Sequence, residues 1–158
     1  MGSNNDISLK ALAKINLGLD VVRRREDGYH EVRMIMQTIH LYDRLDIKRT
    51  KEPGIQIQTN LSFLPVNENN LIYKAAKLLM DEFSITDGVS VKLDKRIPVA
   101  AGMAGGSTDA AAMLIGVNRL FSLGLTKREY GKRCADRGGC TILYYERHGA
   151  GRGHRRGA

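Results

Sequence analysis

The glycine-rich stretch between Ile97 and Ala112 is the part of the chain best suited to chemistry. Its glycines at positions 102, 105 and 106 come directly before Ser107, Thr108 and an alanine-rich run. Glycines let a backbone curl closely around a ligand, and the free N–H groups at a helix start attract anions. The pattern therefore predicts a phosphate-binding loop followed by a helix that starts at Ser107 or Thr108.

Two common nucleotide-binding loops do not fit these residues. No Gly-Lys-Ser/Thr sequence follows, as it would in a Walker A loop, and the G-x-G-x-x-G spacing of dinucleotide-binding folds is missing. A glycine-rich turn with a serine N-cap and no ligand explains the local pattern equally well. Asp109 in the helix start is explained by the helix dipole alone.

A second group of polar residues lies on a predicted strand near the N-terminus. Every odd position from Ile7 to Val21 is apolar, which is the period of a long strand with one buried face. Lys14 and Asn16 therefore emerge side by side on the other face. A lysine in such a place is ordinarily just solvated.

The rest of the pattern predicts the elements that would position these residues. An Asp27-Gly28 turn follows the first strand, and Asn70 is a plausible N-cap for the first helix. The second helix should end near Gly124, and a capping box at Thr126–Glu129 starts another. Further strands are expected around Met34–Leu41, Leu45–Lys48, Ile55–Thr59 and 89–93. The expected fold class is α+β, with mostly antiparallel strands and helices on one face.

The composition is that of one globular domain. The chain has 158 residues, 42% hydrophobic and 27% charged, which is enough for a buried core. No apolar run reaches the length of a membrane span, and the first residues lack the pattern of a signal peptide. The expectation is a cytoplasmic protein without a membrane partner.

The basic charge is unevenly distributed. The net charge is +8, and residues 133–158 hold six arginines against two acidic residues, with no lysine and both cysteines. This break predicts a boundary near Lys132, with a domain over residues 1–132 and an aberrant basic, Gly/Arg-rich tail over residues 133–158.

Three segments in order resemble the motifs of the GHMP small-molecule kinases. They are Ala11–Leu19 (ALAKINLGL), Asp27–His30 (DGYH) and the loop at 97–112. The similarity runs from about Leu9 to Lys132, although Leu12 stands where many members have proline. The resemblance implies the N-terminal GHMP domain, which is similar to the second domain of ribosomal protein S5.

The chain is most similar to members that act in non-mevalonate isoprenoid synthesis. That similarity implies ATP-dependent phosphorylation of the 2-hydroxyl in the methylerythritol part of a cytidine diphosphate substrate. It further implies that Lys14 is catalytic, that Asn16, Tyr29 and His30 bind this substrate, and that Ser107 helps to hold Mg²⁺. The implied ATP-binding residues are Pro98, Val99, Ala100, Ala101, Gly102, Met103, Ala104, Gly105, Gly106, Ser107 and Thr108.

The resemblance also calls for a Gly-Ala-Asp-Val-Pro segment soon after position 130, with a catalytic aspartate, and then a C-terminal GHMP domain. Neither occurs in this sequence, and Asp136 has the wrong neighbours. Permitted codons for the tail, read one base later, give residues like those of the family. We therefore expect a reading-frame slip near Arg133, a truncated and weakly active or inactive chain, and self-association through a bared domain interface.

Two other functions remain open on the sequence alone. A non-catalytic nucleotide-binding module would need only the loop and the base contacts. An S5-like RNA-binding protein would use the basic charge, although binding to nucleic acid is the less favoured reading.

Overall fold

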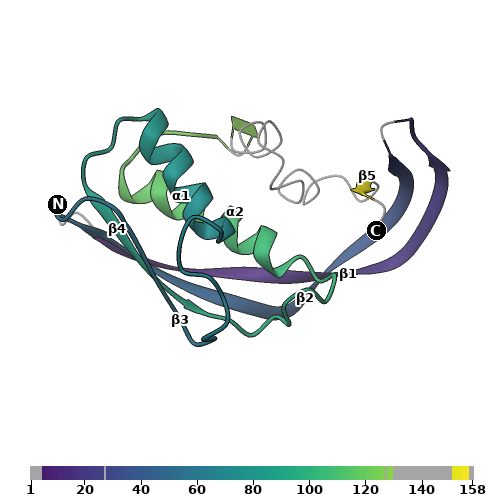
Figure 1. Cartoon of the computed structure of the whole chain (residues 1–158), viewed down its shortest axis with the longest axis horizontal. Coiled ribbons are helices and arrows are strands. Elements are labelled where there is room, and N and C mark those ends of the chain that lie inside the picture. The colour runs from purple at the N-terminus through teal and green to yellow at the C-terminus, as the bar shows by residue number, and fades with distance from the viewer. Residues whose placement is uncertain (1–4, 27, 127, 130–150, 157–158) are drawn as a thin grey trace.

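A computed structural model describes residues 5–26, 28–126, 128–129 and 151–156 of the chain (Figure 1). The last of these segments is described by its backbone alone. In chain order the elements are β1 (Asp6–Arg24), β2 (Tyr29–Thr50), β3 (Ile55–Thr59), α1 (Leu71–Glu82), β4 (Gly88–Asp94), α2 (Gly105–Leu120) and β5 (Gly151–Arg156).

The strands form one mixed sheet in the order β1-β2-β4-β3, with β5 paired to the first part of β2. All pairings are antiparallel except β3 with β4, which is parallel. Both helices lie on the same side of this sheet (Figure 1). The predicted α+β class with helices on one face is confirmed.

The core lies between the helices and the left-hand part of the sheet in Figure 1. Alternate residues of β2 and β4 point into it, because side chains of a strand alternate between its two faces. Helix α2 approaches so closely that a Cβ on Gly116 would collide with Ile47 Cδ1. The largest fully buried side chains include Leu45, Ile47, Ile72, Leu79, Leu93, Met113 and Leu114.

Two expectations about the first strands need correction. The region from Met34 to Lys48 is one continuous strand rather than two, because β2 pairs along its whole length with β1, β4 or β5. The apolar odd positions of β1 are buried only as far as Ala13, and Leu17 and Val21 are each 63% exposed. Beyond the helices, β1 and β2 continue as a bent hairpin, here called the arm (Figure 1).

The Asn70 cap is found where the sequence places it and the Thr126–Glu129 cap in part, whereas α2 ends at Leu120 rather than near Gly124. The Asn70 side chain accepts a hydrogen bond from the Ile72 N–H at 2.9 Å and so caps α1. At Thr126, both the N–H and the hydroxyl donate to Glu129 Oε2 at 2.7 Å, which is the glutamate half of a capping box, while the Glu129 N–H donates to the Thr126 carbonyl at 3.1 Å. The body of the helix expected there lies outside the described residues.

The tail is described only at its end. The boundary at Lys132 and the changed segment after Arg133 lie outside the described residues. Gly151–Arg156 forms β5, in a region where the sequence predicts no regular element. It pairs antiparallel with Tyr29–Met34 on the arm.

Candidate active site

The glycine-rich loop forms the wall of a pocket of about 380 Å³. Every predicted loop residue from Pro98 to Ser107 lines this pocket, together with Asn69, Asn70 and Leu71 at the start of α1. The two helix starts therefore face one cavity. Thr108 does not line it, because its hydroxyl donates to the carbonyls of Ala104 (3.2 Å) and Gly105 (3.1 Å) inside the helix.

The sign of the φ angle alternates along the loop backbone. Ala100, Gly102 and Ala104 have positive φ angles of 61°, 71° and 65°, while the residues between them do not. Such alternation turns successive N–H groups toward one side and creates a concavity that attracts anions. The geometry fits a ligand rich in phosphate oxygens.

Helix α2 starts earlier than the sequence predicts. It begins at Gly105 after an Ala104 N-cap with no side-chain cap, so neither Ser107 nor Thr108 starts it. Gly105 allows this start because its Cα lies against the Lys95 ammonium and Ile97, where a Cβ would be 2.6 Å from Lys95 Nζ. Asp109 consequently lies beyond the first turn, and the dipole explanation for it is wrong.

Strand β1 contacts the loop at Lys14. The Lys14 N–H donates to the Met103 carbonyl at 3.1 Å, which joins the centre of β1 to the centre of the loop. The Lys14 ammonium donates to Asn16 Oδ1 at 3.1 Å, so these two predicted residues lie together in a partly buried place. A register shift between Leu12 and Lys14 marks the same point of the β1–β2 pair.

Tyr29 and His30 lie elsewhere. They begin β2 on the arm, where His30 pairs with Arg24, and neither lines the loop pocket. Thr38, the partner of Lys14, is eight positions further along β2, which corresponds to roughly 26 Å of strand. The arm bends toward the side of the sheet that carries the helices (Figure 1).

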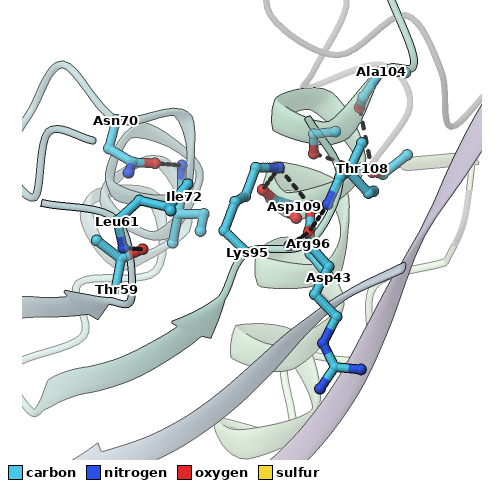
Figure 2. Close-up of polar contacts among 12 residues, drawn as sticks. Asp43, Thr59, Leu61, Asn70, Ile72, Lys95, Arg96, Ala104, Thr108 and Asp109 are labelled. Atoms are coloured by element: carbon cyan, nitrogen blue, oxygen red, sulfur yellow. Dashed lines mark hydrogen bonds and ion pairs between the residues drawn. The ribbon is translucent and has the colours of Figure 1, made fainter. Parts of the chain in front are cut away.

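Below the loop lies a buried ionic cluster that the sequence analysis missed, shown in Figure 2. The Lys95 ammonium bonds to Asp43 Oδ2 and, at 2.8 Å, to Asp109 Oδ2. The other oxygen of Asp43 accepts the N–H groups of Arg96 (2.6 Å) and Ile97 (2.8 Å). All three charged side chains are at most 4% exposed.

Burial raises the pKa of Asp109 to about 7. Desolvation is the main cause; the charge of Asp43 adds to it, while the hydrogen bond and charge of Lys95 oppose it. The remaining oxygen, Asp109 Oδ1, is buried without a hydrogen-bond partner in the described part of the chain. An acid with this environment is unusual for a purely structural ion pair.

The sequence did carry a signal for this cluster. Asp43 is in phase with the buried Leu45 and Ile47 of β2, and Lys95 continues the buried alternation of Val91 and Leu93. Charged residues in phase with a core face are candidates for burial, because strand side chains alternate strictly.

The described residues contain no group of three or more His, Cys, Asp or Glu side chains that could hold a metal ion. The pocket lining does offer single oxygen-bearing side chains, among them Ser107 and Asp109. That pattern suits Mg²⁺, which is often bound through few protein oxygens together with phosphates and water.

The family profile described as "GHMP kinases N terminal domain" matches residues 70–148, half of the chain. The chain belongs to the GHMP kinases. The matched region contains the whole glycine-rich loop and α2.

Within the GHMP kinases, the chain is similar to kinases of one name. The chain is 66% identical over 115 residues to the 4-diphosphocytidyl-2-C-methyl-D-erythritol kinase of Lachnoclostridium phytofermentans, covering 73% of this chain and 40% of that protein. It is 52% identical over 130 residues to the kinase of the same name from Bacillus cereus, covering 82% and 45%. The chain thus spans less than half the length of these curated relatives.

Solved structures give the same picture. A crystal structure of 4-(cytidine 5'-diphospho)-2C-methyl-D-erythritol kinase superimposes with a TM-score of 0.76 at 32% identity, covering 96% of this chain and 53% of that one. The Methanococcus jannaschii mevalonate kinase, at 18% identity and a TM-score of 0.68, shares the fold. In the described residues, no helix is long and apolar enough to cross a membrane.

Proposed function

We propose that this chain binds Mg·ATP in the loop pocket, as part of a kinase that phosphorylates the 2-hydroxyl of 4-diphosphocytidyl-2-C-methyl-D-erythritol, and that the chain itself, which has no Gly-Ala-Asp-Val-Pro aspartate, is weakly active or inactive. The observation that carries the proposal is the hydrogen bond from the Lys14 N–H to the Met103 carbonyl, because it brings the lysine strand to the phosphate loop. The high identity to kinases named for this substrate supports the choice of substrate.

The loop would hold the phosphates mainly through its main chain. Positive φ angles at Ala100, Gly102 and Ala104 favour inward-facing N–H groups, and the N-terminus of α2 adds its positive dipole end. The pocket volume of about 380 Å³ is within the usual range for small-molecule sites. Bound Mg²⁺ would neutralise phosphate charge, with Ser107 as its protein oxygen.

Phosphoryl transfer needs positioning and positive charge more than covalent chemistry. Lys14 would supply charge to the transferred phosphoryl group, and its hydrogen bond to Asn16 holds the ammonium in place. Asn16 would orient the acceptor hydroxyl through its amide. In the family an aspartate would accept the hydroxyl proton, and the Gly-Ala-Asp-Val-Pro segment expected to carry it does not occur in this sequence.

The arm would recognise the base of the substrate. Tyr29 would stack on the cytosine ring, and His30 would hydrogen-bond to its edge, because a ring face and an imidazole suit a flat polar base. Their place on the bent arm keeps them well away from the loop pocket, as expected for a substrate with a base at one end and the reacting hydroxyl at the other.

The division of the chain is also a proposal. We take residues 1–132 as the ATP-binding domain and residues 133–158 as the product of a shifted reading frame, because the tail lacks lysine and is rich in arginine and glycine. Sequencing the coding DNA around codon 133 tests this. A single-base change that restores a Gly-Ala-Asp-Val-Pro segment is expected; its absence contradicts the frame slip.

Thermal unfolding with ligands tests the nucleotide function. Mg·ATP, and separately the cytidine substrate, should each raise the melting temperature of the full chain, because a ligand that binds only the folded state stabilises it. RNA of mixed sequence is the matched comparison. Salt-sensitive binding of RNA without stabilisation by Mg·ATP would contradict the proposal and favour an S5-like function.

A further inference from the structure

The buried cluster of Asp43, Lys95 and Asp109 joins the two ends of the phosphate loop. Asp43 on β2 accepts the N–H groups of Arg96 and Ile97, directly before the loop. Lys95 reaches from the same end to Asp109 in the second turn of α2, the helix that follows the loop. The loop from Pro98 to Ala104 is thus closed at its base by one lysine and two carboxylates (Figure 2).

Lys95 lies at the centre of this closure. Its ammonium contacts both carboxylates, and its Nζ occupies the space that a Cβ at Gly105 would need. Its main chain is also fixed, since its N–H donates to Asn60 Oδ1 at 2.8 Å and its carbonyl accepts from Asn60 Nδ2 at 3.1 Å. Hydrogen bonds thus hold both the main chain and the ammonium of Lys95, and the side chain lies below the first turn of α2.

The burial of this cluster and its position beside the pocket are not explained by a structural ion pair alone. Removing two acids and a lysine from water is costly, and such clusters often stabilise no better than apolar residues would. Asp109 moreover keeps one oxygen without a partner in the described residues, and both Lys95 and Asp109 line the loop pocket. A buried ionic cluster that adds little net stability over apolar residues and borders a binding site is better explained by that site.

We propose that Lys95 is a positioning residue for the phosphate-binding loop: it ties the loop's entry at Asp43 to its exit at Asp109 and so fixes the curvature that receives the nucleotide. This inference rests on the proposed binding of Mg·ATP to the loop. Lys95 itself touches no reacting atom in this account and acts through the loop backbone.

The test compares Lys95→Met with Lys77→Met in the full chain. Lys77 is an exposed lysine on α1 that pairs with Asp81 at 3.0 Å, so the control makes the same change and also breaks a Lys–Asp pair. Calorimetry with Mg·ATP is performed where circular dichroism shows each variant to be folded. We expect roughly tenfold weaker binding for Lys95→Met and less than twofold change for Lys77→Met.

Two further variants separate positioning from charge balance. Asp109→Asn keeps the size and one acceptor oxygen, and should weaken binding by a smaller factor; it also serves if Lys95→Met does not fold. The double variant Lys95→Met/Asp109→Asn relieves the excess negative charge without restoring the tie. It should stay weak, and recovery of wild-type affinity would show that charge balance alone matters and would overturn the inference.

A measurement without nucleotide keeps this inference distinct from the proposed function. Amide NMR signals of Gly102, Gly105 and Gly106 in the ligand-free protein should move in Lys95→Met and stay in place in Lys77→Met. If the wild type fails to bind Mg·ATP while these signals move, the proposed function fails but the positioning role stands. If the signals and the Mg·ATP affinity are both unchanged in Lys95→Met, the inference is wrong.

Discussion

At the scale of single residues, the proposed role of Lys14 depends on its contact with Met103 in the phosphate loop. Its N–H is bonded to Met103, and its ammonium to Asn16, so it is held beside the loop rather than free in solvent. The strand pattern predicts the face on which Lys14 emerges. Its contact with residue 103 is a tertiary contact, which local sequence patterns cannot predict.

Replacing Lys14 by Met should weaken binding of Mg·ATP by about tenfold or more, because a charged hydrogen bond to phosphate is lost. Lys10→Met is the matched control on the same strand, where Lys10 instead lies over the Tyr42 ring at 4.5 Å. Isothermal titration of both variants measures the difference. Equal affinities for the two variants would contradict a phosphate contact by Lys14.

Asp43 makes a prediction about stability. Asp43→Ala should lower the free energy of unfolding by about 3 kcal/mol, because it removes a partner from buried Lys95 and leaves two loop N–H groups unpaired. Asp46→Ala, on the same strand but with its side chain 42% exposed, should cost less than about 1 kcal/mol. Urea unfolding distinguishes them, and similar losses would mean that the cluster adds nothing.

At the scale of elements, the start of α2 is the feature most dependent on packing. Gly105→Ala should destabilise the chain by about 1–3 kcal/mol, since its Cβ would meet Lys95 Nζ at 2.6 Å and Ile97 Cγ2 at 3.0 Å. Gly106→Ala should be close to neutral, because its nearest neighbour is the tip of Leu71 at 3.3 Å and alanine favours a helix. Thermal unfolding of the two neighbours checks this, and a larger loss at Gly106 would refute the packing account.

Elements with a clear local pattern were predicted well. The N-cap at Asn70, the strand at Ile55–Thr59 and the position of the glycine loop all follow from residues close together in the chain. The start of α2 was not predicted, because Ser107 and Thr108 are good caps in isolation while the true start depends on Lys95, ten residues earlier. The cluster joins residues 43, 95 and 109, which are far apart in the sequence. The only sign of it in the sequence is that Asp43 and Lys95 fall at buried positions of the strand alternation.

The arm shows a limit of the same pattern. Alternation from Ile7 to Val21 predicts one buried face, yet burial on β1 ends after Ala13 because the described helices cover only part of the sheet. Periodicity identifies the strand and its faces. It does not tell how far a neighbouring layer extends along the strand.

At the scale of the whole molecule, the arm exposes apolar side chains that neither of the described helices α1 and α2 covers, among them Leu17, Val21 and Ile35. We expect concentration-dependent self-association, because large exposed apolar patches favour contacts between molecules. Sedimentation should show a shift toward monomer in Leu17→Ser/Val21→Ser. Phe63→Ser removes an equally exposed apolar group away from the arm and should change little. A wild-type chain that stays monomeric at every concentration would contradict this expectation.

The central claim is that the loop from Pro98 to Ser107 holds nucleotide phosphates beside Lys14. Amide NMR of the full chain, titrated with Mg²⁺ and a non-hydrolysable ATP analogue, tests it most directly. We expect the largest shifts at Gly102, Gly105, Gly106 and Lys14, with the outer face of the sheet around Lys92 unchanged. Largest shifts at that outer face, with a silent loop, would contradict it.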